Sequence, residues 1–446
     1  FSATTPGLIN IASGTWFDSG GTATGTGISR FNGGTLNLRT NIIPNLLHTG
    51  GDVYVIANTF QQTGSITNLT IDGSQLRGTN RIGTGTLVIN SGGSDGVLIV
   101  GPTGKLQYNT AANKNIYNLR LINQGTVVWS DGNLLGGNTL STTISNGGLW
   151  QITGNNQAYQ TYGGAAITWT NTGTILKSGG TGLSYIADFR LMNASSGVIQ
   201  CDVGTLQLPG NFTNTAGTLK LNGGTIQNSG PLYVSGGILE GQGTVGQNGI
   251  SGGSISPGQS GPGLIGFKSG LTLSTGAIVS IGGTGTTPIT QYDQLSITGA
   301  VTLANATLQV TSLPSVPPGT TFLILQNDGV DPISGTFNGL PQNAALNVSG
   351  QQFRIHYNGG TGNDVTLVRD SGTGAGGPQL ATGGYSNGVF RVRGAGGSSV
   401  IYVIQATTNF LQWTNIGTAT GDISGNFFLQ DTNAFRFPYR FYRTTN

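Results

Sequence analysis

The feature that most constrains the fold of this chain is a repeat of 20 to 25 residues in its middle. Each copy has a short apolar strand fragment, an Asn, a Gly and a second short apolar run, as in LINQGTVVW (121–129) and NFTNTAGTLKL (211–221). One coil of a parallel β-helix, with two or three strands of about four to six residues, has this length. The repeat therefore predicts a β-solenoid, which we extend to the N-terminus through less regular segments. The repeated glycines are separated by 23, 25, 24, 20 and 20 residues and are Gly125, Gly148, Gly173, Gly197, Gly217 and Gly237.

An Asn precedes the Gly in five of these repeats, and we expect these side chains to lie at one corner of the coils. Asn and Gly tolerate the left-handed and bridge conformations that a corner can require. Stacked coils would place the amides above one another, where they could hydrogen-bond along the axis as Asn ladders do in stacked sheets. The five residues are Asn123, Asn146, Asn171, Asn193 and Asn214.

The glycine and charge contents support an all-β chain. Of 446 residues, 79 are Gly and only 7% are charged, whereas ordinary proteins have about 7% Gly and about 25% charged residues. This composition excludes a helical bundle and a charge-rich disordered chain, and the absence of a three-residue Gly period excludes collagen. We therefore predict a parallel β-helix followed by a β cap module and a small C-terminal β-sandwich.

Other bulk properties indicate an extracellular or cell-surface location. The sequence starts at Phe1, as expected after removal of a signal peptide. No apolar run reaches the roughly 18 residues of a membrane-spanning helix, so we expect no membrane span. The net charge is +3, and the excess positive charge lies after residue 378. That segment has five scattered Arg and only two acidic residues, Asp422 and Asp431. These arginines do not form the basic stripe of a nucleic-acid-binding protein, and we expect no nucleic-acid partner.

Composition shifts after Gly230, and four segments there carry a resemblance to a known family. Together they resemble the passenger-associated β-strand repeat region of autotransporter-like secreted bacterial proteins, over about 130 of the 446 residues. The resemblance implies a β-helix that serves as a surface stalk, adhesin or display scaffold. The segments span 239–285, 292–310, 322–342 and 353–368. Their matching pieces are LEGQGTV (239–245), SPG (256–258), YDQL (292–295), the block from FLILQNDGV to FNGLP (322–341) and YNGGTGNDVTL (357–367).

The last segment alternates strongly and is similar to the fibronectin-type-III-like β-sandwiches that end many secreted bacterial proteins. The similarity rests on the segments QATTNFLQWTNIG and RFYR. We expect Trp413 to be the core aromatic residue of the module. The expected parts of the chain are β-helix repeats (1–230), terminal coils and cap (231–370), a Gly-rich linker (371–378) and the C-terminal module (379–446).

Few side chains could carry catalysis or hold a metal. Asp52 and Asp72, about one coil apart, are the pair that we weigh as catalytic carboxylates, although turn aspartates that bond to their own backbone explain them better. His48 and His356 lack the motifs of nucleophilic sites, and we interpret the single cysteine, Cys201, as a core residue. We interpret GGTGNDVTL (359–367) as a hairpin turn and not as a calcium site. We expect no enzymatic activity, no metal and no cofactor.

Three functions remain, in order of preference. The first is a secreted structural protein, a subunit of an extracellular fibre or cell-surface stalk that self-associates head to tail through its ends. The second is an adhesin that binds glycans or cell surfaces through exposed aromatic residues. The third is a β-helix polysaccharide lyase or hydrolase, which needs carboxylates clustered in one groove. The aromatic candidates for the second function are Trp16, Trp129, Trp150 and Trp169.

Overall fold

The structure is a computed structural model, and its described part is all-β, with 60% of residues in strands and 1% in helices. The expected linker 371–378 lies outside the described residues. These are 1–18, 20–56, 58–62, 64–138, 141–258, 261–370, 379–387, 389–397, 400–422 and 425–445. The chain divides into two compact units. The first comprises Phe1–Gly283, Thr287–Thr311 and Leu325–Gly339, and the second Thr284–Thr286, Ser312–Ile324 and Leu340–Asn446.

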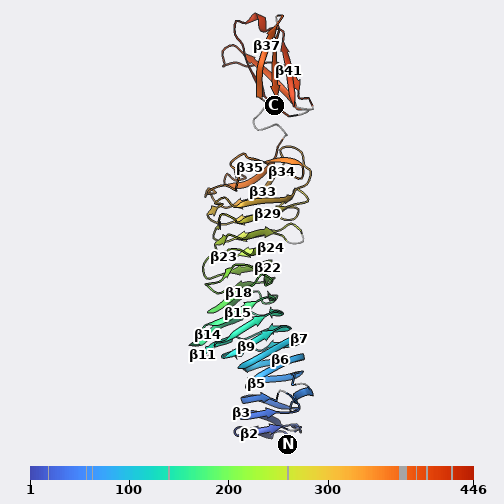
Figure 1. Ribbon diagram of the computed structural model, residues 1–446, viewed down its shortest axis with the longest axis vertical. Helices are drawn as coiled ribbons and strands as arrows, with labels where there is room; N and C mark the ends of the chain where they lie inside the picture. Colours follow the sequence, from blue (N-terminus) through green and yellow to red (C-terminus); the bar gives the residue numbers. More distant parts are fainter. Residues whose placement is uncertain are drawn as a thin grey trace. The chain divides into compact units, whose positions relative to one another are not determined.

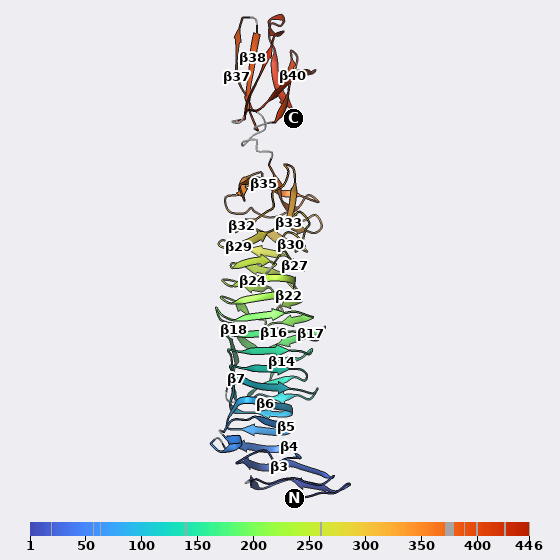
Figure 2. The same cartoon turned by 90° about the vertical axis from the view of Figure 1, so that its right-hand side faces the viewer.

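The first unit is a parallel β-solenoid, and the chain forms about 12 turns of it (Figure 1). Turned by 90°, the same coils are seen stacked along one axis (Figure 2). Most coils place short strands on three faces, and each strand pairs in parallel with strands one coil earlier and one coil later. The predicted parallel β-helix is thereby confirmed.

Each face is a ladder of strands, and the longest strands turn a corner and contribute to two faces. The first face contains part of β6 (Thr79–Ser94) and of β7 (Gly96–Tyr108), then β9 (Leu119–Asn123), β12 (Thr143–Asn146), β15 (Ile167–Asn171), β18 (Phe189–Asn193), β21 (Thr213–Asn214), β23 (Leu232–Val234), β25 (Gly249–Ser251), β28 (Leu271–Leu273) and β31 (Val301–Thr302). The second face contains β1 (Leu8–Ile11), parts of β3 (Ile28–Leu38), β4 (Leu46–Val55), β5 (Asn68–Arg77), β6 and β7, then β10 (Thr126–Trp129), β13 (Leu149–Ile152), β16 (Thr174–Lys177), β19 (Val198–Cys201), parts of β22 (Thr218–Gln227) and β24 (Ile238–Val245), then β26 (Ser254–Pro257), β29 (Ile278–Gly282) and β32 (Thr307–Ser312). The third face contains β2 (Thr15–Asp18), the ends of β3 to β6, β8 (Lys114–Asn115), β11 (Leu134–Asn138), β14 (Gln157–Gly164), β17 (Leu183–Ile186), β20 (Thr205–Gln207), the ends of β22 and β24, β27 (Leu264–Phe267), β30 (Gln294–Ile297) and β33 (Thr321–Asn327).

Alternation along each strand builds the core. In β10 the sequence TVVW turns Val127 and Trp129 inward and leaves Thr126 and Val128 half-buried. The inward residues stack in register from coil to coil, so that Val127 lies below Trp150 and Trp150 lies below Ile175. Full burial of a large apolar side chain stabilises the fold by about 1.5–3 kcal/mol relative to its exposure. A continuous apolar column therefore holds the coils together along the axis.

The glycines that begin the second-face strands are required by close packing between coils. We expected Asn and Gly to use left-handed or bridge backbone at this corner. Gly148 and Gly173 do not use the left-handed region, because neither has a positive φ. A Cβ atom on Gly173 would lie 2.2 Å from the carbonyl oxygen of Gly148, the equivalent residue one coil earlier. The same distance separates a Cβ on Gly148 from the carbonyl oxygen of Gly125. Only glycine therefore allows the coils to approach this closely.

Coils with strands on the same three faces lie on both sides of residue 230. β21 and β23 pair on the first face, and β22 and β24 pair on the other two. The boundary expected at residue 230 therefore falls inside the stack of coils.

The second unit contains small antiparallel sheets. β34 (Ala345–Val348), β35 (Gln351–Gly359) and β36 (Asp364–Arg369) form one ladder. The C-terminal module has two three-stranded sheets around a shared core of Val392, Tyr402, Ile404, Ala419 and Phe427, as expected for a β-sandwich. Its sheets are β37 (Gln379–Ser386), β38 (Val389–Ala395) and β41 (Asn426–Asp431), and β40 (Thr414–Thr420), β39 (Ile401–Thr407) and β42 (Phe441–Thr445). The 3₁₀ helices are η1 (Phe60–Gln62) in the solenoid and η2 (Ala434–Arg436) in the module.

We expect Gly173→Ala to destabilise the solenoid by about 1–3 kcal/mol, because its methyl group overlaps the backbone of the previous coil. Gly230→Ala is the matched control, since a Cβ there has no heavy atom within 4 Å and the backbone φ is not positive. Urea unfolding followed by circular dichroism measures both variants. Equal midpoints for the two would contradict the packing explanation.

Candidate functional site

Five buried asparagines form a continuous ladder of amides at the corner between the first and second faces. In each of four successive pairs, Nδ2 of one Asn donates to Oδ1 of the Asn one coil later, at 2.6, 2.7, 2.9 and 3.1 Å. The Nδ2 groups also donate to carbonyl oxygens of the second face, as Asn171 does to Val198 at 3.1 Å. Because unpaired buried amides are costly, this ladder favours one register between coils. The stacking predicted from the repeat is confirmed for Asn123, Asn146, Asn171, Asn193 and Asn214.

The expected exposed tryptophan surface is not formed by Trp129, Trp150 and Trp169. All three side chains are fully buried, because each occupies an inward position of its strand. The ring centroids of Trp150 and Trp169 lie 4.5 Å apart, and the stack continues to Tyr108 and Phe189 at 6.4 and 6.0 Å. These tryptophans are core residues, and their assignment to surface binding was wrong.

Trp16 is the exposed member of the four. Its side chain is 47% exposed, and its Nε1 donates to the carbonyl oxygen of Ser13 at 2.8 Å. Phe17, which is 57% exposed, adjoins it in β2, and Arg39 lies over the Phe17 ring at 4.7 Å. Trp16 and Phe17 border an apolar hollow of about 280 Å³ on the first coil.

Two lysines are buried inside the solenoid and bind the turns around them. Lys177 Nζ donates to three oxygens of neighbouring turns at 2.9 to 3.0 Å. Lys114 Nζ donates to the carbonyl oxygens of Thr110 and Asp131. Burial lowers the pKa of Lys114 to about 8, against the opposing charge of Asp131, and burial also lowers the pKa of Lys177. Both amines thus satisfy backbone acceptors that the coil would otherwise bury unpaired.

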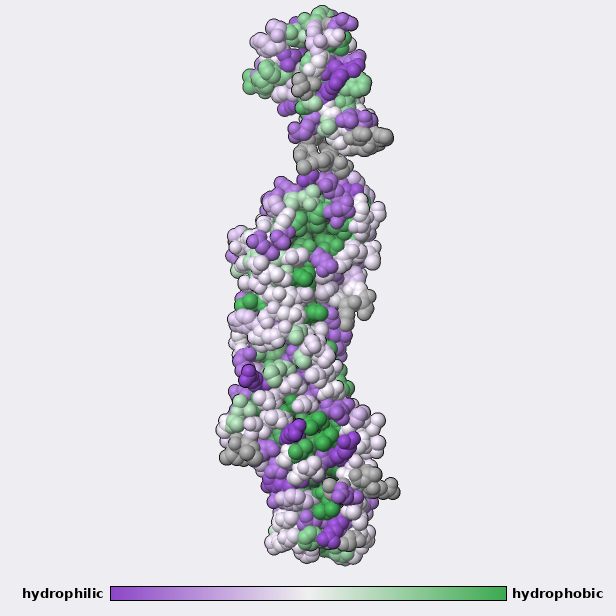
Figure 3. Space-filling view, in the orientation of Figure 1, coloured by the Kyte–Doolittle hydropathy of each residue, from purple (hydrophilic) through white to green (hydrophobic). Residues whose placement is uncertain are grey.

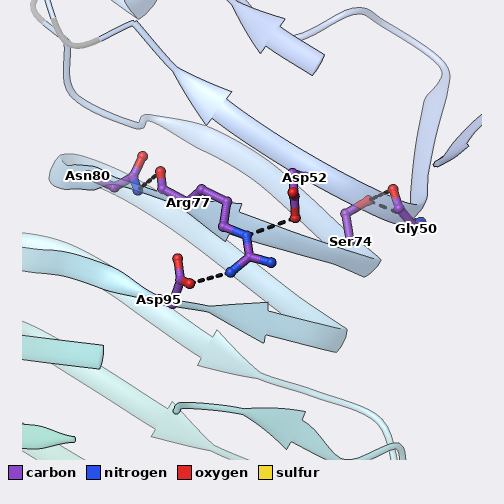
Figure 4. A network of polar contacts seen from close by, with 6 residues as sticks. All are labelled: Gly50, Asp52, Ser74, Arg77, Asn80 and Asp95. Carbon is purple, nitrogen blue, oxygen red and sulfur yellow. Dashed lines mark hydrogen bonds and ion pairs between the residues drawn. The ribbon is translucent and has the colours of Figure 1, made fainter. Parts of the chain in front are cut away.

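Asp52 and Asp72 do not form the carboxylate pair that we weighed as catalytic. Asp52 lies beside Arg77, whose Nε donates to it at 2.8 Å, and Arg77 also pairs through Nη1 with Asp95 (Figure 4). Asp72 is not opposite Asp52 in the ladder, and its Oδ1 accepts a hydrogen bond from Ser91 Oγ at 3.4 Å. Burial lowers the pKa of Arg77, but its hydrogen bonds to the two aspartates and their charges raise it above the ordinary value overall. The network joins three successive coils through fixed charges.

His48 and Cys201 are buried in the solenoid. His48 is in register with Phe31 of the preceding coil, and burial lowers its pKa to about 4. Cys201 is in register with Lys177, and burial raises its pKa to about 11. The thiol therefore stays protonated at neutral pH, and the nucleophilic thiolate is suppressed.

The segment 359–367 forms the hairpin turn expected from its sequence, between β35 and β36. Gly359 pairs with Asp364, whose Oδ2 accepts hydrogen bonds from the N–H and the hydroxyl of Thr361 at 2.8 and 3.0 Å. His356 lies in β35 near Gln342, with 3.5 Å between His356 Nδ1 and Gln342 Nε2. Among the residues that the structure describes, no three His, Cys, Asp or Glu side chains gather closely enough to hold a metal ion.

The C-terminal module carries exposed aromatic and arginine side chains that we did not predict as a site. Contrary to expectation, Trp413 is not part of the module core; it is half-buried, with its ring 6.3 Å from that of Phe410. Figure 3 shows apolar and hydrophilic side chains intermixed on this module. The alternation FRFPYRFYR (435–443) was the signal in the sequence that could have identified it. The exposed aromatic residues, at 40–61%, are Tyr385, Phe410, Phe428, Phe435, Phe437, Tyr439 and Phe441.

Comparison of the chain with protein-family models, with curated proteins and with solved structures finds no match. Within the described residues, no helix combines the length and the apolar character needed to cross a membrane.

We expect Asn171→Ala to destabilise the solenoid by about 1–3 kcal/mol, because Asn193 Oδ1 loses its donor inside the core and Asn146 Nδ2 loses an acceptor. The matched control is Asn211→Ala, which removes an exposed amide. Thermal unfolding of the full chain gives both values. A melting temperature for Asn171→Ala equal to that of the control would show that the ladder adds no stability.

Acidification should destabilise the solenoid through His48. The pKa of His48 is about 4 in the folded protein and about 6.5 in the unfolded chain. Protonation therefore favours the unfolded chain: the stability that neutral His48 contributes is complete above pH 6.5 and is lost as the pH falls towards 4. Asp293, whose pKa burial raises to about 6, changes stability in the opposite direction over this range. Comparison with His48→Leu isolates the histidine.

The wild-type protein should lose about 2–3 kcal/mol relative to His48→Leu between pH 7 and pH 4. Urea titrations at each pH measure this difference. A constant difference between the two proteins across the range would be inconsistent with a buried neutral histidine.

Proposed function

We propose that the protein is an extracellular structural protein whose solenoid forms a cell-surface stalk or the repeating part of a fibre. The observation that supports the proposal is that side chains inside the coils hold successive coils in one register. The amide ladder, the aromatic stack and the two buried lysines each fix one coil on the next. Regular stacking of this kind gives length and stiffness without a large core at any one level.

The resemblance to autotransporter passenger-associated repeats supports this proposal, since the solenoids of that family serve mainly as stalks, adhesins and scaffolds. We assign the chain to that type on the motifs between residues 239 and 367. We further propose that copies associate through their ends. Apolar side chains at the N-terminal end of the solenoid, exposed by 47–57%, offer a surface for such contacts: Leu8, Trp16 and Phe17 of the first coil and Ile28 of the second.

A second function, adhesion, is favoured by one observation. Exposed aromatic rings gather on the C-terminal module, where most of the arginines lie over aromatic rings. Three of the four tryptophans that we expected to bind ligands on the solenoid are buried instead. Aromatic and arginine side chains are enriched at binding surfaces.

We expect the purified protein to form end-to-end chains or fibres, visible by electron microscopy, with a mass that rises with concentration in light scattering. Phe17→Ser should reduce this association, because it removes an exposed apolar ring of the first coil. Tyr233→Ser, which removes a 40% exposed ring from the first face, is the control. A monodisperse monomer at high concentration would refute self-association.

A further inference from the structure

Four aromatic rings of the C-terminal module lie in a row on its surface. The ring centroids of Trp413 and Phe410 are 6.3 Å apart, those of Phe410 and Phe441 are 4.0 Å apart, and those of Phe441 and Tyr439 are 6.4 Å apart. None belongs to the core cluster of the module. The faces and edges of these adjoining rings form one extended apolar surface, which suits a chain-like ligand better than a compact one. With Arg443, these four residues are called the aromatic–arginine surface.

The loop between β39 and β40 holds one ring of this row in a strained conformation. Phe410 has a φ of 60°, a left-handed value that is rare for a bulky residue. Thr407 Oγ1 accepts the N–H groups of Asn409 and Phe410 at 3.2 and 3.1 Å. Asn409 Oδ1 in turn accepts two N–H groups, from Leu411 and Gln412. These hydrogen bonds hold the loop in the conformation that displays the Phe410 ring, which is 58% exposed.

Arg443 is held beside these rings, and some of its hydrogen-bond donors are unused. Its guanidinium lies 4.3 Å from the centre of the Trp413 ring, and its Nε donates to Gln405 Oε1 at 2.7 Å. Gln405 is held by Asn415 on the neighbouring strand at 2.6 Å. The Trp413 ring covers one face of the guanidinium, and its in-plane N–H groups remain accessible to a ligand. The two Nη atoms have no partner among the described residues. A positioned guanidinium edge matches the two oxygens of a carboxylate or sulfate.

Cations and rings also alternate along the adjoining segment. Arg436 lies over Phe435 at 5.5 Å, and Arg440 lies over Phe437 at 4.5 Å. The module has five Arg, no Lys and two Asp, of which Asp431 is buried beside Arg440. The exposed charge is therefore mainly positive. It favours a ligand that carries anionic groups at intervals along its length.

The same stacking argues against a lipid surface. The Arg443 guanidinium lies directly on the Trp413 ring, so burying this ring in hydrocarbon would also bury the cation, at a high cost. An acidic polysaccharide meets both requirements, because each sugar ring has an apolar face and the carboxylates or sulfates recur along the chain. We propose that the aromatic–arginine surface binds an acidic polysaccharide, with sugar faces on the rings and an anionic group on Arg443. This inference does not depend on fibre formation, since a single copy carries the whole surface.

The test uses the full chain and defined polymers in a binding assay such as isothermal titration calorimetry. We expect binding of polygalacturonate or dextran sulfate that is at least tenfold tighter than that of neutral dextran or of poly-glutamate, which has charge but no sugar rings. Arg443→Gln and Tyr439→Ala should each weaken this binding at least tenfold. Their circular dichroism and melting temperature should match the wild type, because both side chains are at the surface.

A matched control removes the same type of pair from β38 and β41. Arg391 lies over Phe428 at 4.7 Å, so the double variant R391Q/F428A lowers the charge equally but leaves the aromatic–arginine surface intact. It should bind as the wild type does. An equal loss in this control, equal binding of poly-glutamate, or tighter binding of oligothymidine or of phosphatidylglycerol vesicles would overturn the proposal.

Phe410→Gly separates ligand binding from a structural role. Glycine adopts the φ of 60° without strain, so the variant should keep or raise the melting temperature while polysaccharide binding falls at least tenfold. A lower melting temperature with unchanged binding would assign Phe410 to stability and refute its place in the site.

Discussion

The solenoid depends on the close approach of successive coils at one corner. There a Cβ atom on Gly148 or Gly173 would lie 2.2 Å from the carbonyl oxygen of the preceding repeat's glycine. A Cβ atom on Gly197 would lie 2.4 Å from the carbonyl oxygen of Asn171. This contact brings the neighbouring asparagines within hydrogen-bonding distance of one another. A shift of one residue between coils would lose the amide ladder and turn the buried rings outward together, because side chains alternate with a period of two. Close packing and register are thus one constraint.

The low charge content follows from the same architecture. A narrow coil has little interior volume, and a charge inside it must be satisfied by the coil's own turns. Lys114 and Lys177 are tolerated because oxygens of adjacent turns surround their amines. Where charges do occur in a row, as at Asp52, Arg77 and Asp95, they link one coil to the next.

The solenoid and the ladder could be predicted from the sequence because spacing alone determines both. An Asn at a fixed place in a repeat of 20 to 25 residues must stack on its equivalents once the coils close. The tryptophans were misassigned because a spacing does not say which face of a strand is inward. Trp169 precedes Asn171 by two residues, so an inward Asn171 already required an inward Trp169. Trp150 lies beyond the corner, where the alternation restarts, and only the structure defines its direction.

The C-terminal module could not be interpreted in this way, because it has no repeat against which to compare its alternation. Its core uses Tyr402 and Phe427, stacked at 4.5 Å, and that leaves Trp413 for the surface. The two parts of the chain therefore use aromatic residues for opposite purposes. In the solenoid the rings of Trp129, Trp150 and Trp169 pack inward between coils, whereas in the module the loop between β39 and β40 displays the Phe410 ring to solvent. Left-handed backbone alone does not distinguish the two parts, since Thr110 and Asp188 of the solenoid have it too. The difference is that the module leaves adjoining aromatic rings exposed, which is the pattern of a binding surface.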